Sequence, residues 1–202
     1  MPFYDMSRIE VLISEPALQE RIRALGEQIT RDYAGAGDLV LICVLKGSYL
    51  FLADLSRAID LPLTVDFMSV SSYGNGFKTS GVVRLVQDLS ESIEGKHVLV
   101  VEDIIDTGLT MSYLLENLQT RRPASLKVVS LLHKPSKARV QVNIDYLGFE
   151  IEDRFVIGYG LDFQGRFRNM PFIGVNTGEG APLSPTSPAS PASPASPSGA
   201  HQ

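Results

Sequence analysis

The stretch VLVVEDIIDTGLTMS, residues 98–112, decides the fold of this chain. It opens with Val98 to Val101, an unbroken apolar run rich in β-branched residues, which predicts a central parallel strand covered on both faces. Glu102 and Asp103 follow, where we expect this strand to end. Ligands of open α/β sheets bind at the carboxyl ends of strands, so the two acids occupy the position of a binding site.

The second half of the stretch predicts a phosphate-binding turn. Small, hydroxyl-bearing and glycine residues at 106–110 precede an apolar helix face formed by Met111, Leu114, Leu115 and Leu118. We expect Thr110 to be the N-cap of this helix. A helix N-terminus exposes backbone N–H groups and the positive end of the helix dipole, so the turn can hold a phosphate dianion without a lysine.

The acid pair narrows the choice of ligand. Carboxylates beside a phosphate would repel it unless they face hydroxyl donors or a metal ion, and a ribose 2',3'-diol with Mg²⁺ meets that condition. The structural alternative is that many strand-loop-helix junctions contain an acid and a Thr-Gly turn. The apolar strand and the acid pair, in register with the turn, favour the binding site.

From Glu102 to Thr110 the stretch resembles the phosphoribosyl pyrophosphate (PRPP) motif of the type I phosphoribosyltransferase family, specifically its hypoxanthine-guanine branch. The resemblance implies that Glu102 and Asp103 position the ribose, and that both bind Mg²⁺ together with Asp162. It also implies that Asp106 is the catalytic base for the purine N7 proton. The 5'-phosphate would be held by the amides and hydroxyls of Asp106, Thr107, Gly108, Leu109 and Thr110.

Three further motifs match the PRPP-binding parts of this family. Lys46 and Gly47 follow the apolar run 39–45 and alone would be an ordinary turn, but they match the pyrophosphate loop, in which the Leu-Lys peptide is commonly cis. Ser72 and Tyr73 begin a polar loop and match the mobile catalytic loop that closes over PRPP. The resemblance also directs Arg168 toward the pyrophosphate.

The purine side of the site is implied by residues at two other strand ends. Lys134 follows the apolar run 126–132, where a lysine is usually a solvated cap, but the resemblance assigns it to the O6 of a 6-oxopurine. Phe155 would stack on the purine, its alternative being a plain core residue, and the backbone of Val156 would read the purine edge. Gly165 departs from the family, which has an acidic or larger polar residue there, and this leaves the shape of the loop from Asp162 to Arg168 open.

Apolar runs alternate with amphipathic patterns along the chain, which predicts an α/β fold with a doubly wound parallel sheet. A first helix is expected after Ser14, with Pro16 in its first turn and a buried face formed by Leu18, Ile22, Leu25 and Ile29. A second helix would bury Phe51, Leu52, Leu55 and Ile59. Extended runs are expected at 39–45, 64–70, 82–86, 126–132 and 155–162. The resemblance implies the type I phosphoribosyltransferase fold, with five parallel strands, flanking helices and a small hood from the chain termini.

Composition sets the outer limits. The 202 residues, 44% of them hydrophobic, suit one domain over 1–176, whereas the Ser/Pro/Ala-rich residues 177–202 cannot form a core and are expected to be disordered. A net charge of −5 argues against nonspecific binding to nucleic acid or to membranes. The single cysteine, Cys43, lies in an apolar run and is expected to be a core residue. Without a long apolar span or a leader pattern, a cytoplasmic protein is expected.

The resemblance therefore implies transfer of a 5-phosphoribosyl group from PRPP to N9 of hypoxanthine, and of guanine as well, giving IMP or GMP and pyrophosphate with Mg²⁺ as cofactor. Family members form homodimers or homotetramers. Two alternatives stay open from the sequence. The first is a PRPP sensor without catalysis, against which Asp106, Lys134 and the lid residues argue. The second is an enzyme for another base, against which Lys134 and Phe155 argue.

Overall fold

The structure is a computed structural model that describes residues 8–72 and 83–177. The expected lid residue Tyr73 and the tail from 178 onward lie outside the described residues, and of Ser72 only the backbone is described. Within the described part, none of the helices has the length and hydropathy needed to span a bilayer.

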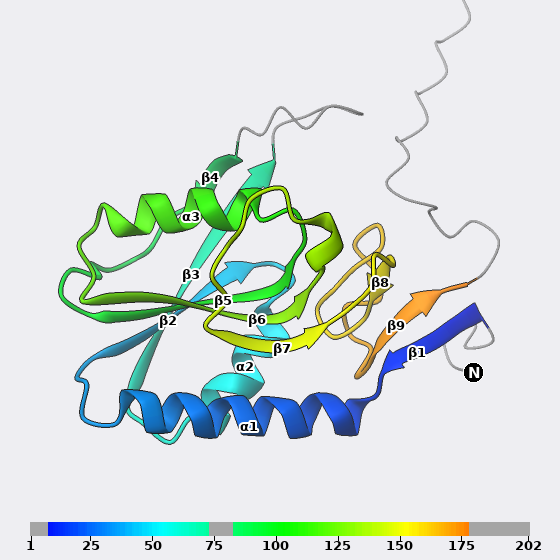
Figure 1. The fold of residues 1–202 in the computed structure, drawn as a ribbon, viewed down its shortest axis with the longest axis horizontal. Coiled ribbons are helices and arrows are strands. Elements are labelled where there is room, and N and C mark those ends of the chain that lie inside the picture. The colour runs from blue at the N-terminus through cyan, green and yellow to red at the C-terminus, as the bar shows by residue number, and fades with distance from the viewer. Residues whose placement is uncertain (1–7, 73–82, 178–202) are drawn as a thin grey trace, which may run out of the picture.

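The main sheet of the described residues has six strands in the order β4-β3-β2-β5-β6-β7 (Figure 1). The strands are β2 Leu39–Leu45, β3 Leu63–Ser72, β4 Val83–Gln87, β5 His97–Ile105, β6 Ser125–His133 and β7 Tyr146–Glu150. Five of them pair in parallel, and β4 pairs antiparallel with β3 at one edge. The predicted five-stranded parallel core is confirmed, and the hairpin after β3 adds the sixth strand.

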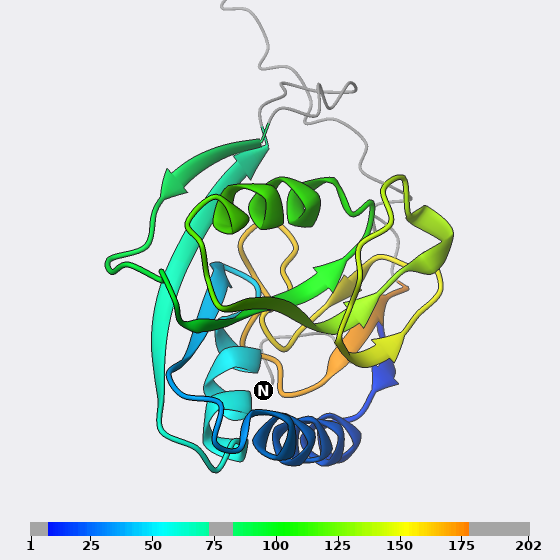
Figure 2. The same ribbon diagram turned by 60° about the vertical axis from the view of Figure 1, so that its left-hand side comes forward.

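Helices cover both faces of this sheet, as a doubly wound fold requires (Figure 2). The helices are α1 Glu15–Tyr33, α2 Tyr49–Ala58 and α3 Leu109–Gln119, and a short 3-10 helix, η2, spans Pro135–Lys137. One core cluster joins α1 and α2 to Leu41 and Leu99, and a second joins α3 to Ile42 and Val100. Since neighbouring residues of β2 and β5 face opposite clusters, β2 is apolar throughout and β5 is apolar from Val98 to Val101.

Of the two expected helix N-caps, the one at Ser14 is confirmed and the one at Thr110 is wrong. Ser14 caps α1, accepting the backbone N–H of Ala17 at 3.5 Å, and the predicted apolar face of α1 is buried. The expected N-cap Thr110 is wrong: α3 begins at Leu109, and its N-cap is Gly108 with φ +79°. A left-handed backbone at this position suits glycine, so the helix begins two residues earlier than an N-cap at Thr110 would place it.

Two strand boundaries also differ from the sequence patterns. Strand β5 continues to Ile105, because its carboxyl half pairs with β6 from Glu102↔Ser130 to Ile105↔His133, so the acid pair lies within the strand. The expected strand over 155–162 is wrong, since only β8, Val156–Ile157, is extended. Positive φ angles at Gly158, Tyr159 and Gly160 turn the chain away after two residues.

A smaller sheet in the order β1-β9-β8 forms the hood, from β1 Ile9–Ile13, β9 Ile173–Asn176 and β8. Strand β9 pairs antiparallel with both neighbours, so the two ends of the described chain and the 156–157 segment are held together. The expected hood built from the chain termini is confirmed (Figure 1).

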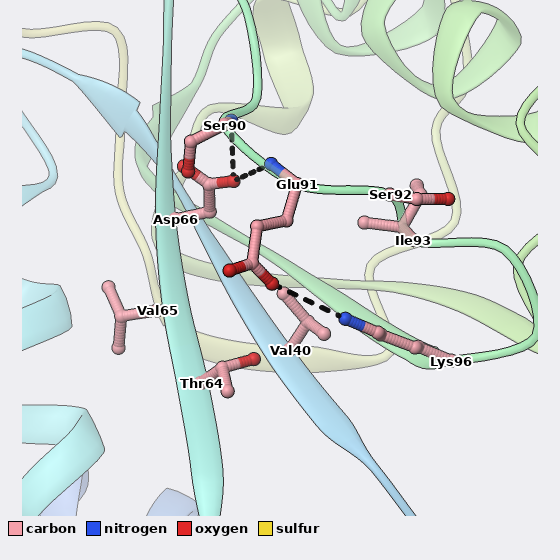
Figure 3. Close-up of a pocket in the computed structure, with 9 residues that line it drawn as sticks. All are labelled: Val40, Thr64, Val65, Asp66, Ser90, Glu91, Ser92, Ile93 and Lys96. Carbon is pink, nitrogen blue, oxygen red and sulfur yellow. Dashed lines mark hydrogen bonds and ion pairs between the residues drawn. The ribbon is translucent and has the colours of Figure 1, made fainter.

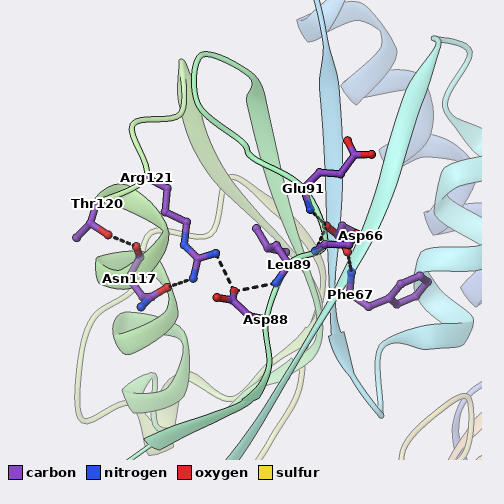
Figure 4. A network of polar contacts seen from close by, with 9 residues as sticks. Asp66, Phe67, Asp88, Leu89, Glu91, Asn117, Thr120 and Arg121 are labelled. Atoms are coloured by element: carbon purple, nitrogen blue, oxygen red, sulfur yellow. Dashed lines mark hydrogen bonds and ion pairs between the residues drawn. The ribbon is translucent and has the colours of Figure 1, made fainter.

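The connection from β4 to β5 is pinned between α3 and β3 (Figure 4). The guanidinium of Arg121 lies 2.7 Å from Asp88 Oδ1, and it also donates to Asn117 Oδ1 at 2.6 Å. Asp66 on β3 accepts the backbone N–H of Ser90 at 2.8 Å. These contacts fix the entry into β5, the strand that carries the acid pair.

Candidate functional site

The β5–α3 junction encloses a cavity of about 120 Å³ at the carboxyl end of the parallel sheet. It is lined by Glu102, Ile104, Ile105, Asp106, Thr107, Gly108, Thr110 and Met111. The structure thus brings the acid at 102, the expected base and most of the expected phosphate turn around one space. Ligands of parallel sheets bind at this edge because the strand ends and helix N-termini meet there.

Two carboxylate oxygens in this cavity are buried without a hydrogen-bond partner in the described part of the chain: Glu102 Oε2 and Asp106 Oδ1. Burial raises the pKa of Glu102 well above its ordinary value, and the neighbouring charge of Asp103 adds to this. The pKa of Asp103 is also raised by burial, although hydrogen bonds from Glu102 and from the Ile104 N–H oppose the rise. Buried oxygens without partners are costly, so they point to groups that a ligand completes.

The phosphate turn is closed from one side by the segment after η2, which the sequence did not single out. The N–H groups of Arg139 and Val140 donate to the Thr107 carbonyl at 3.0 and 3.1 Å. A Cβ on Gly108 would lie 2.2 Å from the Val140 carbonyl oxygen, so glycine is required here by space as well as by its positive φ. Nothing in the local pattern of 138–140 marks this role, because it depends on a contact across the fold.

The Lys46-Gly47 loop packs directly on the acid pair. The Leu45–Lys46 peptide is cis, as it commonly is in the family that the sequence resembles. A Cβ on Gly47 would lie 1.4 Å from Asp103 Oδ2, and a Cβ on Gly160 would lie 1.9 Å from the Gly47 carbonyl oxygen. The Gly47 backbone is therefore in close contact with the Asp103 side chain on one side and with the Gly160 backbone on the other.

Asp162 and Arg168, which the resemblance directed toward Mg²⁺ and pyrophosphate, contact each other. The Arg168 Nη2 lies 2.5 Å from Asp162 Oδ1, and its Nη1 donates to the Gly160 carbonyl at 2.6 Å. The second Asp162 oxygen accepts the Gly165 N–H at 2.7 Å. Both side chains thus belong to one cluster beside the Gly47 loop.

The loop between them explains the glycine at 165. Phe163 and Arg166 pair through two backbone hydrogen bonds of 3.1 and 3.0 Å, which makes a hairpin with two central residues. Both central residues have positive φ, 53° at Gln164 and 79° at Gly165. Such turns favour glycine, so this departure from the family suits the turn that the chain adopts.

Lys134, which the resemblance assigned to the purine, directly follows β6 and is 7% exposed. Its backbone N–H donates to the Ile105 carbonyl at 3.0 Å, which places it beside the residue that precedes Asp106. Its Nζ lies 3.6 Å from Asp153 Oδ1, and the Lys137 Nζ lies 3.1 Å from Asp153 Oδ2. Asp153 is a site neighbour that the sequence patterns missed, because an exposed Glu-Asp pair in a turn is unremarkable.

Phe155 directly precedes strand β8 of the hood, and Val156 is the first residue of that strand. The Phe155 ring meets Phe163 edge to face, with centroids 5.8 Å apart, and Val156 is buried in β8. The contact ties Phe155 to the loop that carries Asp162. Phe155 is therefore held against the site loop, whereas Val156 belongs to the hood sheet.

A larger cavity of about 290 Å³ lies elsewhere (Figure 3). It is lined by Val40, Thr64, Val65, Asp66, Ser90, Glu91, Ser92, Ile93 and Lys96. These residues lie near the amino ends of β2, β3 and β5, opposite the edge that carries the acids. None of the residues that the sequence marked for function line this larger cavity, so the volume of a cavity does not identify the functional site in this protein.

Comparison with known proteins gives a consistent assignment. The family model described as "Phosphoribosyl transferase domain" matches residues 10–164. A hypoxanthine-guanine phosphoribosyltransferase from Bacillus subtilis is 49% identical over 166 residues, covering 82% of this chain and 92% of that protein. A crystal structure of a hypoxanthine phosphoribosyltransferase from Staphylococcus aureus is similar with a TM-score of 0.82 and 43% identity, covering 87% of this chain and 96% of that one.

The chain is also similar to a longer protein. It is 50% identical over 166 residues to the "Bifunctional protein TilS/HprT" of Listeria monocytogenes, covering 82% of this chain but only 26% of that protein. This chain thus corresponds to about a quarter of the bifunctional relative. The family match over residues 10–164, together with the similarity to hypoxanthine-guanine phosphoribosyltransferases, shows that the chain belongs to the phosphoribosyltransferase family, in its hypoxanthine-guanine branch.

Proposed function

We propose that this chain transfers the 5-phosphoribosyl group from PRPP to N9 of hypoxanthine or guanine, forming IMP or GMP and pyrophosphate. The observation that carries the proposal is the cavity at the β5–α3 junction, in which two carboxylate oxygens without partners in the described residues face a helix N-terminus. The similarity to hypoxanthine-guanine phosphoribosyltransferases supports the same reaction. A PRPP sensor without catalysis would have no use for a buried base at Asp106.

The 5'-phosphate would be bound by the turn from Asp106 to Thr110. The backbone N–H groups at the start of α3 lack helical acceptors, and together with the helix dipole they suit a dianion. The hydroxyl of Thr110 lines the cavity and adds a donor. The contacts from Arg139 and Val140 to the Thr107 carbonyl hold this turn in place before the ligand arrives.

The reacting bond joins the ribose C1' to the pyrophosphate, and its cleavage develops positive charge on the ribose as in glycoside hydrolysis. Glu102 at the cavity edge would bind the ribose hydroxyls, and Asp103 would support the loop at Gly47. Asp106 would accept the N7 proton of the purine as N9 attacks C1'. Its buried oxygen without a partner in the described part of the chain is consistent with that role.

The donor set fits Mg²⁺. The Glu102 and Asp106 oxygens that lack partners within the described residues are carboxylate oxygens, the ligands that Mg²⁺ prefers. Among the described residues no group of three or more His, Cys, Asp or Glu side chains is arranged to hold a metal ion, so Glu102, Asp103 and Asp162 do not form a ready-made site in the ligand-free protein. Phosphate oxygens of the ligand would complete the shell. We propose that Glu102, Asp103 and Asp162 face the ion. When bound, Mg²⁺ would neutralise charge on the leaving pyrophosphate.

The leaving group would be held by the Lys46-Gly47 loop and by Arg168. The Arg168 guanidinium forms an ion pair with Asp162 and donates to the Gly160 carbonyl. These two contacts fix its orientation beside the site. Planar guanidinium groups suit phosphate oxygens. Ser72, the last residue of β3, and Tyr73 would close over PRPP.

The purine would lie between Phe155 and Lys134, and the backbone of Val156 would contact its edge. A lysine ammonium is a donor only, so Lys134 can pair with the O6 acceptor of hypoxanthine or guanine but not with the 6-amino group of adenine. We further propose that residues 1–176 form the catalytic domain and that the protein is a cytoplasmic homodimer or homotetramer.

The test is an absorbance assay with PRPP, Mg²⁺ and each purine base in turn. We expect turnover with hypoxanthine and guanine and negligible turnover with adenine, and no turnover when Mg²⁺ is removed by a chelator. PRPP binding without turnover of any base would instead identify a sensor.

A further inference from the structure

Tyr159 is anchored in an unusual backbone conformation beside the site. Its φ is +47°, a region that non-glycine residues rarely adopt, and its side chain is 4% exposed. The phenol donates to Asp54 Oδ2 at 2.5 Å. Burial and this bond raise the pKa of Tyr159, so the phenol stays protonated and remains a donor at every working pH.

Asp54 lies on α2, and several donor side chains contact its carboxylate. Its Oδ2 also accepts from Gln19 Nε2 of α1 at 2.9 Å, and its Oδ1 lies 3.6 Å from the exposed guanidinium of Arg57. A hydrogen bond to a carboxylate is roughly twice as strong as one between neutral groups. Tyr159 is thus held by a charged acceptor that is fixed from two helices.

The bond closes a ring of contacts around the pyrophosphate loop. Gly160, the residue after Tyr159, packs so closely on the Gly47 carbonyl that a Cβ would lie 1.9 Å from it. Gly47 in turn is followed by Ser48 and α2, the helix that carries Asp54. The contacts therefore form a closed loop. The chain runs from Gly47 through α2 to Asp54, and Asp54 accepts the hydrogen bond of Tyr159. The next residue, Gly160, packs back on Gly47.

The same ring reaches Arg168. The Gly160 N–H donates to the Arg168 carbonyl at 2.9 Å, and the Arg168 guanidinium donates to the Gly160 carbonyl at 2.6 Å. Any shift of Gly160 therefore moves both the Gly47 loop and the arginine. Both belong to the pyrophosphate half of the site.

We propose that Asp54 and Tyr159 are positioning residues for pyrophosphate: their hydrogen bond holds Gly160 against Gly47 and sets the position of Arg168. This inference rests on the proposed phosphoribosyl transfer. It extends that proposal to a pair of residues that lie outside the cavity and reach the substrate only through Gly47, Gly160 and Arg168.

The other half of the site is held by separate contacts. The 5'-phosphate turn is fixed by Arg139 and Val140 through the Thr107 carbonyl, and Lys134 is fixed by the Ile105 carbonyl. Val156 is held by its pairing with Val175 in the hood. Loss of the Asp54–Tyr159 bond should therefore weaken ligands that carry pyrophosphate more than it weakens a nucleoside monophosphate.

The experiment compares Tyr159→Phe and Asp54→Ala with the unaltered full-length protein. We expect the KM of PRPP in the forward reaction and of pyrophosphate in the reverse reaction to rise about tenfold, which equals about 1.4 kcal/mol. The Kd of IMP, measured by calorimetry without pyrophosphate, should change less than about twofold. Asp54→Asn keeps an acceptor oxygen and should restore most of the loss, and Arg57→Ala, which touches the same carboxylate from solvent, should behave as the unaltered protein.

Equal weakening of IMP and pyrophosphate in Tyr159→Phe, or no change in either, would overturn the inference, since a general loss of structure does not choose between ligands. Failure of Asp54→Asn to rescue would also contradict it. If the unaltered protein shows no turnover at all, the proposed function itself fails, which is a separate and distinguishable result. Thermal melting of each variant shows that the compared proteins are folded.

Discussion

Gly47 has no room for a side chain because the Asp103 carboxylate occupies that space, with a Cβ on Gly47 lying 1.4 Å from Asp103 Oδ2. Asp103 is 9% exposed, and its other oxygen accepts the Ile104 N–H at 2.8 Å, so the carboxylate cannot turn away cheaply. We expect Gly47→Ala to lower the free energy of unfolding by about 1–3 kcal/mol, the usual cost of overpacking. Chemical denaturation and the KM of PRPP measure the two consequences, and KM should rise.

A double variant checks the cause. Asp103→Ala in the Gly47→Ala background removes the overlapping group, so stability should return toward that of Asp103→Ala alone while activity stays low. Strictly additive stability effects would show that the two positions do not collide.

Glu102 should reduce the stability of the ligand-free protein. Its Oε2 is buried without a partner in the described residues, and burial beside Asp103 raises its pKa. Glu102→Gln removes a buried charge, so we expect the melting temperature at neutral pH to rise by a few degrees, about 1 kcal/mol, while kcat/KM falls. Glu27→Gln, on the exposed face of α1, is the matched control and should change neither quantity. A lower melting temperature for Glu102→Gln would mean that its carboxylate is already compensated.

Asp106→Asn tests the base. The amide cannot accept the N7 proton, whereas the backbone N–H groups that we propose bind the 5'-phosphate are unaltered, so kcat should fall about 10²-fold or more with little change in the KM of PRPP. Steady-state kinetics with hypoxanthine gives both values. An unchanged kcat with a raised KM would make Asp106 a binding residue only.

Burial of Cys43 should make the free energy of unfolding depend on pH in the alkaline range. The thiol is fully buried in β2, and burial raises its pKa to about 11 from 9.0. Between these values the folded protein keeps a proton that the unfolded chain releases, so stability is complete below pH 9 and declines as pH rises toward 11, by at most about 1.4 kcal/mol per pH unit. We expect the slope of unfolding free energy against pH to be shallower in Cys43→Ala, measured by urea denaturation. Parallel slopes would exclude Cys43 as the source.

The sequence was a good guide wherever a pattern is local. Strand β2 has the bounds that its apolar run predicts, and Ser14 is the N-cap of α1 as expected. Burial of β2 on both faces explains its unbroken apolar run, and the buried face of α1 explains the helical spacing of its apolar residues. The error at Thr110 is also local: a hydroxyl suggested the cap, but the left-handed backbone of Gly108 made it.

What the sequence did not show depends on contacts between distant residues. Tyr159 and Asp54 are 105 positions apart, and neither stands in a motif. Asp153 became a neighbour of Lys134 only because the 151–154 turn folds back over the end of β6. Such pairs are set by the packing of whole elements, which single-sequence patterns do not encode.

The contact between Lys134 and Asp153 changes what base selection should look like. A buried lysine with adenine in place of a 6-oxopurine loses its ligand acceptor, and a wholly uncompensated site would reject adenine by roughly 10⁴-fold or more. Here the Asp153 carboxylate, 3.6 Å from Nζ, remains as a partner for the cation. The penalty is therefore reduced, and Asp153 is itself shared with Lys137.

We expect kcat/KM for hypoxanthine to exceed that for adenine by at least about 10²-fold, since a charged group deprived of its ligand partner costs about 3 kcal/mol. In Lys134→Gln most 6-oxopurine activity should be lost. The ratio of kcat/KM for hypoxanthine to kcat/KM for adenine should fall, because an amide both donates and accepts. Asp153→Asn should widen the ratio, since it removes the carboxylate charge that compensates Lys134 when adenine is present. Lys137→Ala leaves Asp153 to Lys134 alone, so it should narrow the ratio slightly without loss of hypoxanthine turnover. Steady-state assays with both bases on the four proteins decide the matter: comparable kcat/KM values for adenine and hypoxanthine in the unaltered chain would remove Lys134 from base recognition.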